Sequence, residues 1–166
     1  MKSLIWLFLS VILLTSCART YYVVRHAEKA SQAPNMTSDV PLSDAGQQRA
    51  LALREVLKDK KIDSIFSTNT IRTRSTAQPT AEHFKVNIAS YGPMPNADFI
   101  NRLKAIRKNV LIVGHSNTVD DIVNGLTGTQ SVPGDLADSQ YDNLYVIRVK
   151  GKKARFENKK YGVLTP

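Results

Sequence analysis

Short apolar, β-branched runs alternate with longer segments of helical spacing from residue 20 onward, and this alternation limits the possible folds more than any other feature. The expected strands cover residues 21–25, 62–66, 86–90, 110–114, 143–149 and 154–158. The expected helices cover residues 43–58, 70–84, 97–108 and 118–126. This order predicts an α/β three-layer sandwich with a central, mostly parallel sheet, and the last two strands predict a C-terminal antiparallel hairpin.

The composition is that of one globular domain. Of the 166 residues, 42% are hydrophobic, which excludes a disordered chain. A single cysteine, Cys17, cannot close an internal disulfide, and no Cys/His set has zinc-finger spacing. We therefore expect one domain over residues 17–166, preceded by a signal segment over 1–16.

The N-terminal segment has the character of an export signal. Its apolar stretch, residues 4–14, covers 11 residues, whereas a membrane-spanning helix takes roughly 20. Residues 14–17 read LTSC and resemble the lipobox of bacterial lipoproteins, which implies cleavage before Cys17 and its acylation. The alternative is a plain secretory signal cut near Ala18. The prediction is an exported, lipid-anchored protein of the bacterial cell envelope, on its periplasmic or outer-surface side.

The positive charge is concentrated near the C-terminus. The formal net charge is +9, and residues 148–160 hold seven basic side chains against one acid, Glu157. This stretch could rest on an anionic membrane surface, or it could be a solvated edge strand protected by lysines. We expect no nucleic-acid partner, because there is no recognised binding motif and few aromatic residues lie near the basic stretch.

Two histidines occupy equivalent places in the predicted sheet. His26 and His115 each directly follow an expected strand, and ligands of open α/β sheets bind at the carboxyl ends of the strands. Arg25 adjoins His26, and Arg72 follows the next expected strand along the chain. Two imidazoles and two guanidiniums at one edge favour a doubly charged oxyanion, of which phosphate fits the arginine fork best.

Three motifs in this order resemble the histidine phosphatase superfamily, also called the phosphoglycerate-mutase-like family. They are residues 25–28 (RHAE), 67–77 (STNTIRTRSTA) and 114–117 (GHSN), and the resemblance covers essentially residues 20–149. It implies a phosphoglycerate-mutase-like fold and a phosphorylated substrate. It also implies that His26 is the nucleophile that becomes phosphorylated.

The other site residues follow from the same resemblance. Arg25, Arg72 and His115 are expected to hold the transferring phosphoryl group, with Ser67 and Asn117 as further substrate-binding candidates. A histidine attacks phosphorus with a neutral ring nitrogen, so its other nitrogen has to be held as a donor. We expect the arginines and a protonated His115 to stabilise the developing charge with no metal and no cofactor.

The leaving alcohol needs a proton, and the sequence offers two carboxylates for it. Asp98 lies about where mutase-like relatives carry their general acid, and Glu28 is the alternative. The longest loops, residues 31–41 and 127–142, leave little room for a cover over the site, which favours hydrolysis over phosphoryl transfer.

We therefore predict a histidine acid-type phosphatase, a phosphoric monoester hydrolase of the short, lidless kind. The hypotheses left open are a phosphoglycerate-mutase-type phosphotransferase and a catalytically impaired, anion-binding lipoprotein. A metal-dependent hydrolase built on the histidines is disfavoured, because flanking arginines repel a divalent cation.

Overall fold

A computed structural model describes residues 18–31 and 39–165, so the predicted signal over 1–16 and the lipidation candidate Cys17 lie outside the described residues. The strands are β1 (Arg19–Arg25), β2 (Ser64–Thr68), β3 (Ile88–Tyr91), β4 (Val110–Gly114), β5 (Asn143–Lys150) and β6 (Lys153–Lys160). The helices are α1 (Asp44–Leu57), α2 (Ile71–Phe84), α3 (Ala97–Ala105) and α4 (Val119–Thr127).

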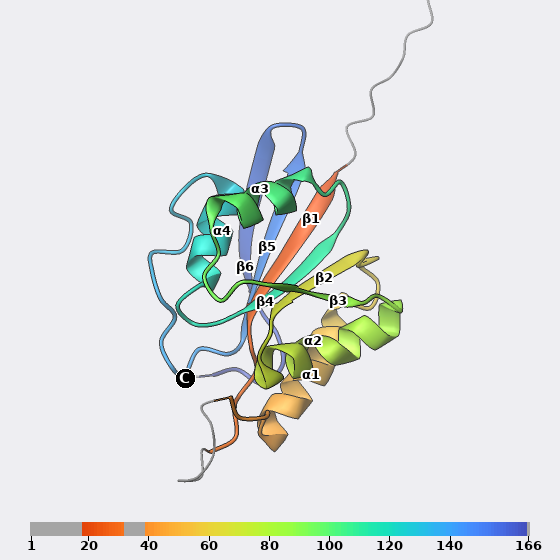
Figure 1. Cartoon of the computed structure of the whole chain (residues 1–166), viewed down its shortest axis with the longest axis vertical. Helices are drawn as coiled ribbons and strands as arrows, with labels where there is room; N and C mark the ends of the chain where they lie inside the picture. Colours follow the sequence, from red (N-terminus) through yellow and green to blue (C-terminus); the bar gives the residue numbers. More distant parts are fainter. Residues whose placement is uncertain (1–17, 32–38, 166) are drawn as a thin grey trace, which may run out of the picture.

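The six strands form one sheet in the order β3-β2-β4-β1-β5-β6 (Figure 1). The neighbours among β3, β2, β4 and β1 are parallel, whereas β5 runs antiparallel to β1 and β6 antiparallel to β5. The predicted α/β sandwich with a mostly parallel sheet and a C-terminal antiparallel hairpin is confirmed. Among the described residues, no helix is long and apolar enough to cross a membrane.

The sheet is covered on both faces, and the alternation of side chains along β1 shows how. Tyr21 and Val23 pack into the core under α3 and α4, while Tyr22 and Val24 pack into the core under α1 and α2. Successive side chains of a strand point to opposite faces, so a strand buried on both sides has to be apolar throughout. This explains why the central strands read as continuous apolar runs in the sequence.

Some element boundaries differ from the expected ones. The second strand begins at Ser64 and ends at Thr68, two residues later than predicted, so Ser67 lies inside the strand. Helix α3 ends at Ala105, three residues early, because Ile106 is extended at φ −72° and ψ 121°. The helical spacing does continue past that point, but the chain turns there to enter β4.

Strand register fixes where the predicted site residues emerge. Arg25 of β1 lies opposite Gly114 of β4, and Ser67 of β2 lies opposite Val113 of the same strand. The three strands therefore end at one edge of the sheet, with β4 in the middle.

Candidate active site

The two predicted histidines lie side by side. His26 donates its backbone N–H to the carbonyl of Gly114 over 2.9 Å, which ties the end of β1 to the end of β4. Its imidazole and that of His115 are 5.4 Å apart between ring centroids, at an interplanar angle of 68°. The parallel pairing thus brings together side chains that are distant in the sequence, as expected.

His26 has one ring nitrogen held by the backbone. Its Nδ1 lies 2.8 Å from the carbonyl oxygen of Ala27, so Nδ1 carries the proton and donates. Nε2 is therefore the nitrogen with a free lone pair. Burial, followed by the positive charges of Arg25 and Arg72, lowers the pKa of His26 to about 3, so its ring is neutral near pH 7.

His115 is held in the other tautomer. Its Nδ1 lies 3.4 Å from Nη2 of Arg72, which can only donate, so Nδ1 is the acceptor. Its Nε2 lies 2.8 Å from Oγ1 of Thr68, and that hydroxyl donates onward to Thr73. Nε2 consequently carries the proton and donates to Thr68.

Burial, followed by the charge of Arg72, lowers the pKa of His115 to about 4. In the unliganded site the ring of His115 is therefore neutral near pH 7, and the protonated His115 expected with a phosphoryl group bound stays a prediction. Burial disfavours the charged ring most, and the arginines that would attract an anion add to this effect by repelling a proton from the ring beside them.

Arg25 links the site to the loop before β5. Its Nη1 donates to the carbonyls of Ala137 over 2.9 Å and Asp138 over 3.1 Å. Its guanidinium also lies 4.1 Å from the ring centroid of Tyr141. Its buried Nε has no hydrogen-bond partner in the part of the chain that the structure describes. Arg25 is thus fixed in place by the loop before β5.

Arg72 lies on the first turn of α2, which begins after the N-cap residue Thr70. Its Nη1 is 3.4 Å from the carboxylate of Asp39. Both oxygens of Asp39 also accept the backbone N–H of Ile71, at 2.9 and 3.1 Å. Asp39 therefore positions both the start of α2 and the guanidinium of Arg72. It lies outside the three sequence motifs, and no sequence signal marked it.

These side chains line a shallow pocket of about 400 Å³, which we call the histidine pocket. Its lining residues are Arg25, His26, Lys29, Thr70, Arg72, Pro93, Met94, His115, Ser116, Asn117 and Asp138. The structure thus brings Asn117 to the predicted site. Ser67 is fully buried, and its hydroxyl donates to the carbonyl of Thr68 over 2.8 Å, so it is not part of the lining.

Neither carboxylate considered for the general acid lines the histidine pocket. Glu28 accepts from Nε and Nη2 of Arg49 at 2.9 and 2.6 Å, and it lines a different cavity between α1 and the C-terminal segment. Asp98 is exposed on the first turn of α3. The carboxylate that does line the pocket is Asp138, whose Oδ1 lies 3.6 Å from Nη2 of Arg25.

The charge of the histidine pocket suits an anion. Arg25, Arg72 and Lys29 line it against the single acid Asp138. The two guanidiniums offer hydrogen-bond donors to a small anion, and the imidazole fixed by the backbone offers a nucleophile to the same anion. In the described residues, no set of three or more histidine, cysteine or acidic side chains is arranged to hold a metal ion.

Comparison with known families gives this geometry a context. Residues 21–91 match the family model of the histidine phosphatase superfamily (branch 1). The match covers 71 of the 166 residues, and over this part the chain is similar to the histidine phosphatase superfamily. The matched part holds His26 and Arg72, while His115, directly after β4, lies beyond it. No curated protein is significantly similar in sequence.

Solved structures support the superfamily fold. A protein assigned as the phosphohistidine phosphatase SixA of Agrobacterium tumefaciens has 23% identity and a TM-score of 0.64, over 87% of this chain and 97% of that one. The corresponding assignment in Nakamurella multipartitia has 20% identity and a TM-score of 0.62, over 88% and 96%. Phosphoglycerate mutase of Bacillus anthracis has 15% identity and a TM-score of 0.61, over 87% and 94%. The predicted phosphoglycerate-mutase-like fold is confirmed.

Proposed function

We propose that the chain is a phosphatase that hydrolyses a phosphate ester or a phosphoprotein through a phosphohistidine intermediate on His26. The observation that carries this proposal is the Nδ1–H of buried His26 donating to the carbonyl of Ala27 beside the two arginines. It supplies what a histidine nucleophile needs, a neutral ring with the lone pair on Nε2.

In the first step the Nε2 lone pair of His26 attacks phosphorus, and the bond from phosphorus to the leaving group breaks. The leaving group departs with that electron pair and takes up a proton. Arg25 and Arg72 hold the phosphoryl oxygens, whose negative charge grows in the transition state. In the second step water attacks the phosphohistidine, inorganic phosphate leaves, and Nε2 recovers its lone pair.

Hydrolysis is favoured over transfer to a second substrate because the pocket is open to water. Four of the lining residues are exposed, namely Pro93, Met94, Asn117 and Asp138. A mutase has to keep water from its phosphoenzyme, which takes an enclosed site. The open rim supports phosphatase activity and also admits a large phosphorylated substrate such as a protein side chain.

The experiment that tests the proposal is the trapping of a phosphoenzyme with an activated aryl phosphate. We expect turnover and a labelled intermediate that is labile to acid and stable to alkali, both absent in His26→Ala. Arg72→Ala should lower the rate about a hundredfold, the usual effect of losing one charge-stabilising donor.

Arg74→Ala is the matched control for that variant. Arg74 lies on the same helix, two residues after Arg72, but its Nη1 is near Ser90 Oγ and it lies outside the histidine pocket. Its removal should leave the rate unchanged. Turnover without a labelled protein in a rapid quench would contradict the phosphohistidine mechanism.

A second function, an anion-binding lipoprotein without catalysis, is favoured by one observation, namely that Asp98 and Glu28 lie away from the pocket. The aryl phosphate separates the two functions, since a good leaving group needs little help from an acid. Phosphate binding without turnover of this substrate would favour the binding protein.

We further propose that the mature chain is exported and carries lipid on Cys17. The support is the apolar segment 4–14 followed by LTSC at 14–17. Mass spectrometry of the protein isolated from a bacterial host should find an acylated Cys17 as the first residue, and Cys17→Ser should release the protein from membranes. An unmodified first residue near Ala18 would indicate a plain secretory signal.

A further inference from the structure

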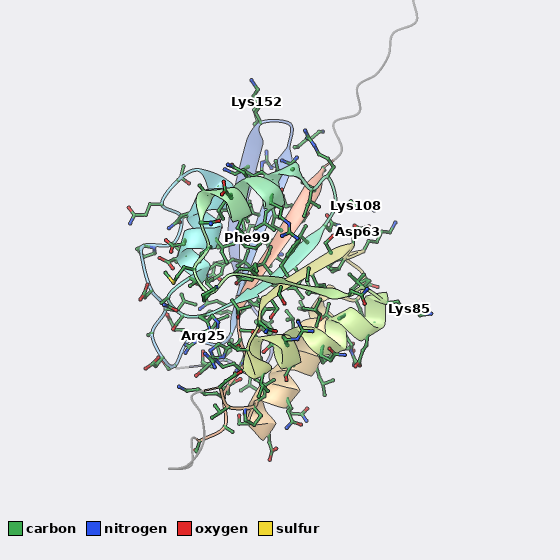
Figure 2. All side chains as sticks on the ribbon, in the orientation of Figure 1. Arg25, Asp63, Lys85, Phe99, Lys108 and Lys152 are labelled. Atoms are coloured by element: carbon green, nitrogen blue, oxygen red, sulfur yellow. The ribbon has the colours of Figure 1, made fainter. Side chains whose placement is uncertain are left out.

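The end of the sheet opposite the histidine pocket carries an exposed group of cations, which we call the basic edge. It consists of Lys104 in the last turn of α3, Arg107 and Lys108 after that helix, and Lys150, Lys152 and Lys153 at the tip of the β5–β6 hairpin. Figure 2 shows Lys152 at the tip of the hairpin and Arg25 of the pocket toward the other end of the molecule.

Strand register brings the two halves of the basic edge together. Lys150 pairs with Lys153 where the hairpin turns, and the adjacent Val149 pairs with Arg19 at the start of β1. On the other side of β1, the backbone N–H of Thr20 donates to Oδ1 of Asn109 over 2.9 Å. The hairpin tip and the segment before β4 thus flank the point where the chain enters the sheet (Figure 1).

The charge of the basic edge is little compensated. Its one ion pair among the described residues joins Lys108 to Asp63 at a long 3.9 Å. Cations farther along the hairpin differ, because Arg148 and Lys159 pair with Glu157, and Lys160 pairs with Asp142. In the basic 148–160 stretch, the cations with no ion pair among the described residues are therefore those at and next to the hairpin tip, namely Lys150, Lys152, Lys153 and Arg155.

The partner that fits this surface is a bilayer. Residue 18, just before β1, is where the described chain meets residues 1–17, and these contain the apolar stretch 4–14 and Cys17. The basic edge contains no aromatic side chain on which nucleobases could stack. Lysines next to a membrane-directed segment are attracted by anionic headgroups.

We propose that the basic edge docks on an anionic phospholipid bilayer and fixes the orientation of the domain on it. The proposal relies on the export in the proposed function, but not on its catalysis. Strand β1 has seven residues, so at about 3.3 Å per residue it holds the histidine pocket about 20 Å from the docked end. The pocket then faces the aqueous phase, and its substrates are water-soluble phosphorylated molecules or protein side chains, not membrane lipids.

Amine footprinting of the full chain on vesicles tests this orientation. The chain is reconstituted on neutral phosphatidylcholine vesicles or on vesicles with about 30% phosphatidylglycerol, and the fraction that floats is measured before labelling. On the anionic vesicles we expect Lys104, Lys108, Lys150, Lys152 and Lys153 to react about threefold more slowly. Lys29 and Lys159 should react equally on both, and about 0.5 M salt should abolish the difference.

A pair of variants separates charge from structure. Replacing Lys150, Lys152 and Lys153 by glutamate should remove the protection of Lys104 and Lys108, whereas replacing the same three by arginine should keep it. Both variants alter exposed positions of the hairpin tip, and the two lysines that report on docking are intact in each.

The outcomes distinguish the two proposals. Protein that floats on both vesicle types with equally reactive lysines is anchored but undocked, which overturns the docking surface alone. Protein that floats on neither overturns both the docking surface and the anchor. Equal protection of the same lysines by a polynucleotide would identify a general polyanion surface and overturn the assignment to a bilayer.

Discussion

At the scale of single residues, the two histidines differ in the nitrogen that carries the proton. His26 donates from Nδ1 to a backbone carbonyl, and His115 donates from Nε2 to Thr68. Each is kept neutral, chiefly by burial and then by neighbouring positive charge. A resting site of this kind keeps the lone pair of the His26 Nε2 available for attack.

The neutrality of His26 can be measured directly. Since the pKa of His26 is lowered to about 3, its ring should remain the Nδ1–H tautomer from neutral pH down to about 4.5, where an ordinary histidine is protonated. Histidine-labelled NMR spectra recorded across this range give the ring-nitrogen shifts. The His26→Gln variant assigns the signals of His26, because they are missing from its spectrum. A titration of His26 centred near pH 6.5 would contradict a buried ring flanked by positive charge.

The general acid can be identified from leaving-group dependence. If Asp138 supplies the proton, Asp138→Asn should slow a poor alkyl leaving group at least tenfold and an activated aryl phosphate little. Asp98→Asn is the parallel variant for the acid favoured by sequence position. An equal loss on both substrates in Asp138→Asn would indicate a positioning role through Arg25 instead.

Glu28→Gln should act on stability. Its carboxylate is bound by two nitrogens of Arg49, whose guanidinium also donates to the carbonyls of Tyr161 and Val163. Losing the charge should lower the free energy of unfolding by about 2 kcal/mol, as for other hydrogen bonds to charged groups. Urea titration measures it, and an unchanged midpoint together with lost activity would restore Glu28 as the acid.

At the scale of elements, the contact between helix α1 and the segment after β1 holds His26 in place. The carbonyl of Glu28 accepts the backbone N–H of Ser43, the N-cap residue of α1. Gly46, in the first turn, packs directly on the same carbonyl. The absence of a side chain at Gly46 therefore sets how closely α1 approaches the chain two residues beyond the nucleophile.

Gly46→Ala tests this contact. A Cβ at this position would lie 2.1 Å from the carbonyl oxygen of Glu28, so either helix α1 or the segment after β1 has to move. Overpacking of this kind costs about 2 kcal/mol, and we expect a lower urea midpoint together with reduced turnover. Gly134→Ala, where a Cβ meets nothing within 4 Å, should change neither. Equal midpoints for the two variants would contradict the close approach.

At the scale of the whole molecule, the histidine pocket makes the fold sensitive to acid. Both histidines have folded-state pKa values, about 3 and about 4, that lie below the unfolded value near 6.5. Between these values the unfolded chain binds more protons than the folded one. The stability of the fold is therefore complete above about pH 6.5 and declines as the pH falls toward the folded values.

Urea titrations between pH 7 and 4.5 measure this decline. We expect the free energy of unfolding to fall as the pH falls, with a slope that corresponds to the uptake of up to about two protons on unfolding. The slope should flatten when both His26 and His115 are replaced by glutamine. The exposed His83 is the control, because His83→Gln should leave the slope as it is. A slope unaffected by the double replacement would place the acid sensitivity elsewhere in the chain.

The sequence by itself determined the layers of this protein and the edge at which its chemistry lies. Continuous apolar strands such as 110–114 and intervening helical segments are local patterns, and local patterns are enough to order an α/β sheet. His26 and His115 could be placed together because each follows a strand of that sheet. Arg72 could be added because it follows a third.

Only the tertiary structure decided which ring nitrogens carry the protons and which carboxylate lies in the histidine pocket. The tautomer of His115 depends on Arg72 and Thr68, the pairing of Glu28 on Arg49, and the entry of Asp138 into the pocket on its contact with Arg25. These partners are separated by 21 to 113 positions in the chain. Side-chain packing between distant segments has no local periodicity, so its result is fixed only when the sheet and helices assemble.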